Sequence, residues 1–393
     1  MSSAKDADSE SRVDSFLRGG LLYNLLFKGG LAHPGMPGVR TRSMGLICLT
    51  YIPLVILAAT QGVALNQTLK VPFLFDISEL VRFIFVGPLL IAAEAIIEPW
   101  LIQVVSHTRS RLVPADRLPE FEATLCRTRR WRDSPIPEIA LLIVAFVGPS
   151  LDTHLIPQLE IGTWHLLPSE STPSNAALYY AYFAKPLVRF LWLRWLWHYL
   201  LWSAFLIRLS SMPLKVIATH PDREGGLAFI TVGHSRLSLL AFGFGLQASS
   251  ILATQILLEG KSLFSFKYEI IGILSIMLGI FLTPLLAFTG KLLEAKRKGL
   301  FDYGALADEY TEAFHTKWIS GERGNEVLLG TGDIQSLADL GNSYEVVREM
   351  KSCLIGKNII TIIAVSTLLP FAPLILTVYP FDELLRNLLK AVM

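Results

Sequence analysis

Charged residues are scarce in this sequence. Asp, Glu, Lys and Arg make up 17% of the 393 residues, against about 25% in an average soluble domain, while hydrophobic residues make up 52%. The formal net charge is only +2, so no general excess of basic groups indicates binding to nucleic acid. The composition instead predicts an integral membrane protein with the lipid bilayer as its main partner.

Cysteine and short catalytic motifs are also rare. The three cysteines, Cys48, Cys126 and Cys353, are odd in number and far apart, which argues against a disulfide framework and a cysteine metal site. The chain contains no GxSxG, HExxH or paired CxxC motif, so we expect no cofactor. The N-terminal stretch SSAKDADSESRVD is acidic and polar, whereas a cleavable signal peptide has a basic region and an apolar core, so none is expected.

Long apolar runs are what the sequence has instead. Seven of them are about 20 residues long, which is the length of a helix that crosses a bilayer. They cover residues 43–65, 80–105, 137–156, 182–209, 235–258, 268–290 and 358–379. The third contains Gly148 and Pro149, so a re-entrant or broken helix is its alternative. The seventh contains Pro370 and Pro373, and if it is re-entrant, six spans remain. We predict an all-α fold, a polytopic transmembrane helix bundle.

The distribution of arginine predicts the orientation of this bundle. Residues 106–136 contain seven arginines, whereas residues 157–175 contain no Lys or Arg. Because short cytoplasmic loops retain Lys and Arg, these segments lie on opposite sides and the third span crosses. The N-terminus is then cytoplasmic, and residues 1–42 form a cytoplasmic segment with an interfacial helix at 13–31.

A sizeable polar region separates the sixth and seventh spans. Residues 291–356 begin with the basic run KLLEAKRK and continue with two amphipathic stretches, in which apolar residues recur three and four apart. We therefore predict a cytoplasmic helical hairpin, docked on its own spans or on a second copy of the chain in a homo-oligomer. Residues 357–393 form the last span and an amphipathic tail.

The fifth and sixth spans carry small residues at helical spacing. Small side chains at such spacing let helix backbones approach closely in a membrane. The positions are Ala241, Gly245, Ser249 and Ala253 in the fifth span and Gly272 and Gly279 in the sixth. The loop between these spans is short, so we expect them to be antiparallel neighbours. Gln247 and Gln255 of the fifth span could instead line a pore.

The loop after the fourth span reads THPDREGGLAFITVGHSR. It contains His220, Asp222, Glu224 and His234, which are residue types found in metal and catalytic sites, although such a site needs ligands that converge in space. The Pro-Asp pair and the two glycines are typical of a turn. We adopt the turn as the interpretation and expect no metal.

Two stretches resemble motifs of a known family. HPDREGGL at 220–227 and TGDIQSLADLGNSYEVVREM at 331–350 are similar to motifs that a family of bacterial multi-pass inner-membrane proteins, of unassigned function, carries in the same order. The resemblance covers roughly the C-terminal half of the chain. It implies a bacterial inner-membrane location but no activity and no functional residues.

Basic residues inside the fourth span need an explanation. On insertion scales, an Arg at mid-bilayer raises the free energy of membrane insertion by about 2.5 to 3.5 kcal/mol, whereas a Leu lowers it by only about 0.3 to 0.6 kcal/mol. Lys185 and Arg208 are about 35 Å apart along a helix, so both can reach opposite interfaces. Arg189 lies about 6 Å further in than Lys185, still within reach of headgroups. Counted from Lys185, Arg194 and His198 remain near the centre, on one face of the helix.

The second span offers partners for these two residues. Glu94 and Glu98 are also four apart, and the same helical rise places Glu94 about 18 Å and Arg194 about 14 Å below the outer ends of their spans. We predict that Glu94 pairs with Arg194 and His198 inside the bundle and that Glu98 faces a cytoplasmic vestibule. The alternative is a structural ion pair that fixes the helix register.

The intramembrane charges suggest a function. Ionisable groups inside a membrane mark ion or substrate paths by default, histidine titrates near neutral pH, and clustered arginines suit an anion. We therefore expect a channel or transporter, rather than an enzyme, for an anion or a proton-coupled anionic solute. The first alternative is a sensor or assembly scaffold that acts through the helical hairpin. The second is a membrane-embedded enzyme that uses the HPDREGG loop.

Overall fold

The computed structural model describes residues 14–31, 38–152, 162–167, 172–321, 327 and 330–378. Within these ranges the chain is helical, and extended pairing is limited to two isolated bridges, Val71 with Thr163 and Leu166 with Pro173. The all-α fold class is therefore confirmed for the part of the chain that is described.

The helices follow one another with short connections. Their bounds are α2 Gly20–Lys28, α3 Val39–Thr60, α4 Ile77–Val81, α5 Gly87–His107, α6 Leu118–Asp133, α7 Pro135–Asp152, α8 Asn175–Tyr179, α9 Lys185–Ser211, α10 Ala228–Ser235, α11 Ser238–Glu259, α12 Lys267–Leu286, α13 Thr289–Phe314, α14 Asp333–Arg348 and α15 Lys357–Leu368. Single π-helical turns, Arg82–Val86 and Tyr180–Ala184, join α4 to α5 and α8 to α9. Each of these two pairs is therefore one continuous rod.

Five helices are long and apolar enough to cross a membrane. They are Val39–Thr60, Ile77–Leu112, Ala228–Glu259, Leu263–Leu286 and Lys357–Thr377. They correspond to the first, second, fifth, sixth and seventh predicted spans. The last of them continues past Leu368 as a 3-10 helix, which contains both prolines, Pro370 and Pro373.

The third and fourth predicted spans differ from these five. The described apolar part of α7 is short, Pro135–Val147. The rod formed by α8 and α9 runs from residue 175 to residue 211, about 55 Å at 1.5 Å per residue, so its length far exceeds a hydrocarbon layer of about 30 Å. Basic side chains within α9 lower its hydropathy. That these two helices cross the membrane stays a prediction.

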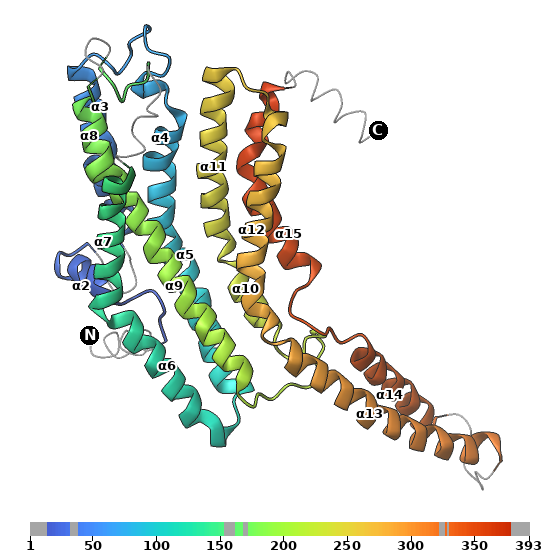
Figure 1. Ribbon diagram of the computed structural model, residues 1–393. Coiled ribbons are helices and arrows are strands. Elements are labelled where there is room, and N and C mark those ends of the chain that lie inside the picture. Colours follow the sequence, from blue (N-terminus) through green and yellow to red (C-terminus); the bar gives the residue numbers. More distant parts are fainter. Residues whose placement is uncertain are drawn as a thin grey trace.

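The helices lie side by side in a bundle, and α13 and α14 leave its lower end as a hairpin (Figure 1). In Figure 1 the helices α3, α5, α7 and α9 occupy one side of the bundle, and α11, α12 and α15 occupy the other. A core of buried side chains, including Leu101, Trp202 and Phe281, joins the two sides. The paired helices of the predicted hairpin are present, and its cytoplasmic location stays a prediction.

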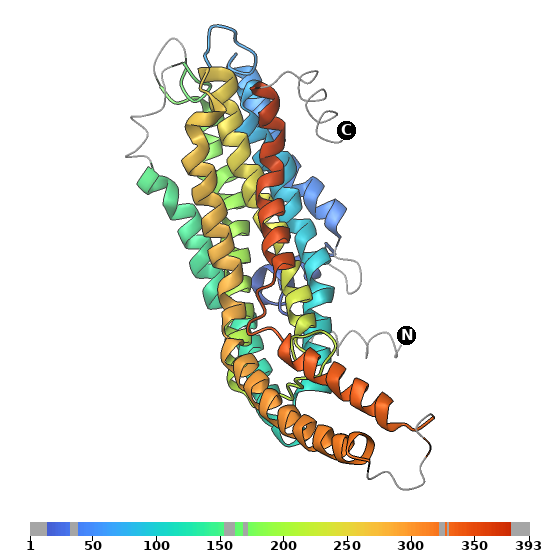
Figure 2. The same cartoon turned by 90° about the vertical axis from the view of Figure 1, so that its right-hand side faces the viewer.

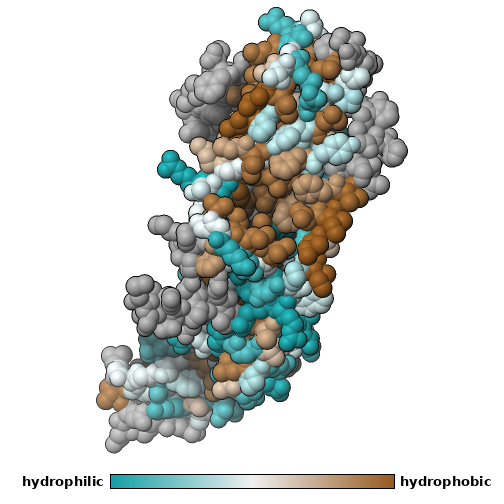
Figure 3. All heavy atoms as spheres, turned by 90° about the vertical axis from the view of Figure 1, so that its left-hand side faces the viewer, coloured by the Kyte–Doolittle hydropathy of each residue, from teal (hydrophilic) through white to brown (hydrophobic). Residues whose placement is uncertain are grey.

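The outer surface of the bundle is apolar. On the face in Figure 3, hydrophobic residues gather over the middle of the bundle and hydrophilic residues over its lower part. Large side chains such as Ile56 of α3, Ile143 of α7 and Leu200 of α9 are half exposed. Exposed apolar side chains gathered in this way are typical of a surface that contacts lipid. Together with the five apolar helices, they describe a membrane-embedded protein.

The close neighbour of the small residues on α11 is α15 (Figure 2). A Cβ at Gly245 would lie 2.2 Å from the backbone oxygen of Thr367 of α15, so only glycine allows this approach. Ala241, Ser249 and Ala253 are buried on the same helix. At Gly272 and Gly279 of α12 a Cβ would meet nothing within 4 Å. The predicted packing at these two glycines is wrong, because that face of α12 is open.

Candidate functional site

Four charged side chains meet inside the bundle, each from a different helix. Glu94 of α5 forms an ion pair with Arg194 of α9, and its second oxygen lies 2.8 Å from Nη2 of Arg42 of α3. The Nε of Arg194 donates a hydrogen bond of 3.1 Å to Oε1 of Glu138 of α7. The Arg194 and Glu138 side chains are each only 3% exposed. We call these four residues the buried charge network.

The network is electrically balanced, since two arginines face two carboxylates. Every member has an ionic partner within it. Ions are stable at a buried site only if they are paired and hydrogen-bonded, so the network explains how α9 tolerates Arg194. The structure thus brings Glu94 and Arg194 together, as the helical depth suggested.

The network lies nearer to one end of the bundle than the sequence indicated. Arg42 belongs to the first turn of α3, and Glu138 belongs to the first turn of α7. Lys185 does not begin the helix that contains Arg194, because the rod starts ten residues earlier at Asn175. The count from Lys185 therefore underestimated the distance of Arg194 from the start of its rod, and the depth of Arg194 in the membrane stays a prediction.

Glu98 and His198 lie next to the network but outside its ion pairs. Glu98 is 1% exposed, its Oε2 accepts the backbone N–H of Leu17 at 3.1 Å, and its Oε1 has no partner among the described residues. His198 is 3% exposed, and neither ring nitrogen forms a hydrogen bond within the described chain. The backbone of Phe16 is the polar group that approaches the ring. The predicted open vestibule at Glu98 is therefore wrong.

Residues 14–18, which we call the N-terminal segment, cover Glu98 and His198. Asp14 binds both terminal nitrogens of Arg109 at 2.5 and 2.6 Å, and Arg132 of α6 donates to the Ser15 carbonyl at 2.5 Å. Phe16, 2% exposed, packs with ring centroids 5.0 Å from Trp202 of α9. The segment is thus fixed by charge on its outer side and by aromatic packing on its inner side.

Glu138 connects α2, which follows the N-terminal segment, to the network. Its Oε2 accepts the backbone N–H of Leu22 in the first turn of α2 at 2.8 Å, while its Oε1 accepts from Arg194. A carboxylate is stabilised at a helix N-terminus by the unpaired N–H groups there. Gly20, at φ +84°, makes room for it, since a Cβ there would lie 2.6 Å from Glu138 Oε1. The predicted helix within residues 13–31 is thus α2, held against the network.

The fifth predicted residue, Arg189, lies apart from this site. Its Nη1 donates to the carbonyl oxygen of Ala145 of α7 at 3.3 Å. Arg42 and Glu138 were not predicted as members of the site, because both stand at the ends of predicted spans, where a charged residue is common. An acidic residue directly followed by the apolar run 139–151 was the available signal for Glu138.

A second polar cluster lies at the opposite end of the α4–α5 rod. Arg82 contacts Glu79 at 2.5 Å, and Tyr180 donates to Glu79 at 2.8 Å. The Nε of Arg82 also donates to Oε1 of Gln247 of α11 at 3.3 Å. Arg82 therefore ties three helical rods together, and Gln247 serves as an acceptor for it rather than as an isolated pore-lining amide.

The HPDREGG loop forms a turn built around Asp222. This carboxylate accepts the backbone N–H groups of Glu224 at 2.8 Å, Gly226 at 3.1 Å and Ala228 at 3.2 Å. Burial alone would raise the pKa of Asp222, but the hydrogen bonds from these N–H groups lower it by a larger amount. The pKa of Asp222 therefore lies below its ordinary value. His220 Nδ1 lies 2.8 Å from the same carboxylate.

The remaining acidic and histidine side chains of this loop have separate partners. Glu224 binds Lys351 at 2.6 Å. His234 is buried in α10, where its ring binds Trp202 Nε1 at 3.1 Å and the Phe281 carbonyl at 2.7 Å. No group of three His, Cys, Asp or Glu side chains that could hold a metal occurs among the described residues. The four residues thus have turn and packing contacts, and the enzyme alternative gains no support from them.

We expect Asp222→Ala to destabilise this turn by about 1 to 2 kcal/mol, because three backbone donors lose their acceptor. Since the pKa of Asp222 is lowered in the folded state, its contribution is full above about pH 4 and is lost as the pH falls below that value. Thermal unfolding of both proteins between pH 3 and 7 should show a difference that shrinks at the acid end. Asp308→Ala, at an exposed site on α13, is the control and should show no such trend.

Comparison with known proteins identified no related protein. Searches of protein-family models, curated proteins and solved structures each found no match to this chain. The resemblance of the two motifs to an inner-membrane family stays a prediction. The function must therefore be argued from the site alone.

Proposed function

We propose that this protein is a proton-coupled membrane transporter or channel, described here in a closed conformation. The observation that carries the proposal is the pair Glu98 and His198. Both are titratable and buried beside the network, and each has polar atoms without a described hydrogen-bond partner. Ionisable groups at such positions are functional-site candidates by default, because an unpaired buried polar group lowers stability and needs a reason to be present.

The balanced network favours a proton over an anion as the coupled species. Its two arginines are neutralised by Glu94 and Glu138, so no free positive charge at the network attracts an anion. A group that gains or loses a proton changes this balance by one unit. Protonation of Glu98 or His198 beneath the network would therefore alter how strongly its ion pairs hold α3, α5, α7 and α9 together.

The direction of the path follows from the N-terminal segment. It covers Glu98 and His198 on the side where α6 and the α13–α14 hairpin lie (Figure 1). That side carries the arginine-rich segment 106–136, and we propose that it is cytoplasmic, in a bacterial inner membrane. Release of the segment would then expose the proton site to the cytoplasm.

The proposal predicts that Glu98→Gln and His198→Gln each slow proton flux about 100-fold, the lower range for removing a positioned proton-transfer group. Reconstituted liposomes with an entrapped pH-sensitive dye and a clamped membrane potential measure this flux. Glu120→Gln, at an exposed site on α6, is the control and should transport normally. Normal flux in both variants, with normal elution on size exclusion, would refute a proton path through these residues.

A scaffold or sensor is the second candidate, and the hairpin favours it. Phe301 and Leu306 of α13 are 76% and 48% exposed, and Ile334 of α14 is 54% exposed. Exposed apolar side chains on a polar hairpin are typical of a surface that meets a partner. Liposomes that show no flux under proton, chloride or phosphate gradients would favour this candidate over transport.

A further inference from the structure

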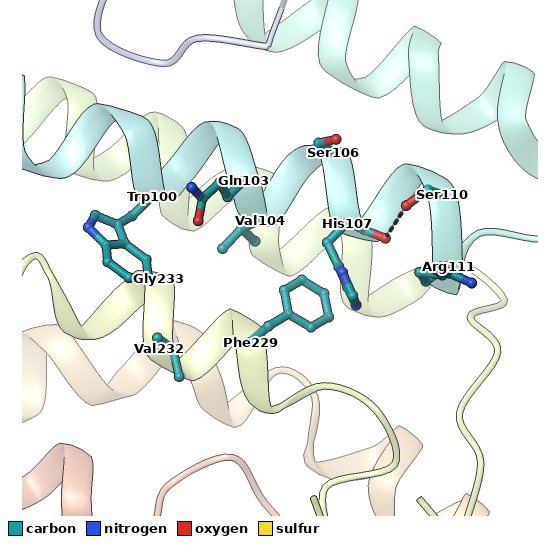
Figure 4. Close-up of a pocket in the computed structure, with 10 residues that line it drawn as sticks. All are labelled: Trp100, Gln103, Val104, Ser106, His107, Ser110, Arg111, Phe229, Val232 and Gly233. Carbon is teal, nitrogen blue, oxygen red and sulfur yellow. Dashed lines mark hydrogen bonds between the residues drawn. The ribbon is translucent and has the colours of Figure 1, made fainter.

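A groove of about 460 Å³ lies between α5 and α10, outside the buried charge network (Figure 4). In Figure 4, Trp100 and His107 on α5 face Phe229 and Val232 on α10, and Arg111 lies beyond His107 at one end. The ring centroids of His107 and Phe229 are 4.2 Å apart. The groove thus has an aromatic and apolar floor with polar groups along its edge.

The charge of this groove is positive. The guanidinium of Arg236 lies 3.9 Å from the ring centroid of Trp100, at one end of the groove, and Arg111 lies at the other. No described acidic residue lines the groove, and neither arginine forms an ion pair within the described chain. Gln103 and Ser106, also in the lining, add hydrogen-bonding groups. An unpaired guanidinium such as that of Arg111, beside neutral hydrogen-bonding groups, suits a phosphate group, and Arg236 adds a second positive charge at the far end.

The groove lies level with the boundary of the apolar part of the bundle. Thr231, between Phe229 and Val232, donates to the carbonyl oxygen of Leu354 at 3.4 Å. The membrane-length helix Lys357–Thr377 begins three residues after Leu354. Tryptophan and arginine at this level are typical of the membrane interface, where headgroups lie.

We propose that this groove binds the phosphate group of an anionic membrane lipid. Arg111 holds the phosphate at one end of the groove, Phe229 and Trp100 contact the glycerol and the first methylenes of the acyl chain, and Arg236 at the other end adds to the positive charge that attracts the lipid. Basic pockets between membrane helices on the cytoplasmic side are known to take such headgroups. A free phosphate ion would use Arg111 equally well, but it would leave the apolar floor exposed to water.

Native mass spectrometry of the full-length protein in neutral detergent tests this proposal. The probes are phosphatidylglycerol and phosphatidylcholine, with inorganic phosphate as a competitor. A basic residue near an anionic headgroup contributes about fivefold in affinity, so Arg111→Gln combined with Arg236→Gln should weaken phosphatidylglycerol binding about 25-fold. Arg127→Gln combined with Arg130→Gln removes the same charge from exposed positions on α6 and should leave binding unchanged.

Three results would overturn the proposal. An equal loss in both double variants would mean unspecific surface attraction, and equal binding of the two lipids by the unmodified protein would mean that charge does not select the ligand. Displacement of the lipid by millimolar inorganic phosphate would assign the groove to a soluble anion. Val232→Trp fills the groove without altering charge and provides a second variant, which should weaken lipid binding while the protein remains folded.

Discussion

Arg194→Gln is expected to lower the free energy of unfolding by about 3 to 5 kcal/mol, because it leaves two buried carboxylates with one cation. Glu138 would lose its ionic partner, and Glu94 would keep only Arg42. Tryptophan fluorescence during chemical unfolding in detergent measures the change. Arg189→Gln, on the same helix, is the matched control and should cost less, since its described bond is to a backbone carbonyl.

A paired substitution separates the loss of charge balance from the loss of packing. Arg194→Leu combined with Glu138→Leu removes one cation and one anion and leaves Arg42 paired with Glu94. Replacing both members of a buried pair with apolar groups is often neutral, so we expect most of the lost stability to return. If Arg194→Gln is as stable as Arg189→Gln, the network does not hold the bundle together.

The sequence was sufficient to predict most of the long apolar helices and one ion pair, but not α6, which lies within the arginine-rich segment, where a loop is predicted. Length and hydropathy are local properties, so five predicted spans appear with nearly the expected bounds. Glu94 and Arg194 could be matched because each is four residues from a second ionisable group on its own helix. Such spacing fixes the face of a helix, and the insertion cost requires a partner.

The other members of the site depend on distant packing, which the sequence does not encode locally. Arg42 and Glu138 reach the network because the first turns of α3 and α7 lie beside Glu94 and Arg194 in the bundle. A hydropathy profile does not show how the ends of different helices are positioned relative to one another. The distance of Arg194 from the start of its helix was underestimated because the π-helical turn at Tyr180–Ala184 continues the helix beyond Lys185. The burial of residues 14–18 follows from contacts with α5, α6 and α9 that lie 80 or more residues away.

The N-terminal segment should open when its aromatic anchor is removed. Phe16 is 2% exposed and packs on Trp202 and Phe205, and removal of a buried Phe side chain costs about 3 to 5 kcal/mol. Because Phe16 is the aromatic contact of a short segment whose other contacts are hydrogen bonds and an ion pair, the cost should fall on its local opening rather than on the whole bundle. We expect the Leu17 amide in Phe16→Ala to exchange its hydrogen about 100-fold faster or more, measured by mass spectrometry.

The same variant tests whether the segment closes a proton path. If Glu98 and His198 belong to that path, Phe16→Ala should raise proton flux in liposomes, and Glu98→Gln added to it should abolish the gain. Leu25→Ala, at a 57% exposed site on α2, controls for truncation of an apolar side chain near the same region. Faster exchange at Leu17 without any change in flux would mean that the segment only stabilises this end of the bundle, and that proton access does not depend on it.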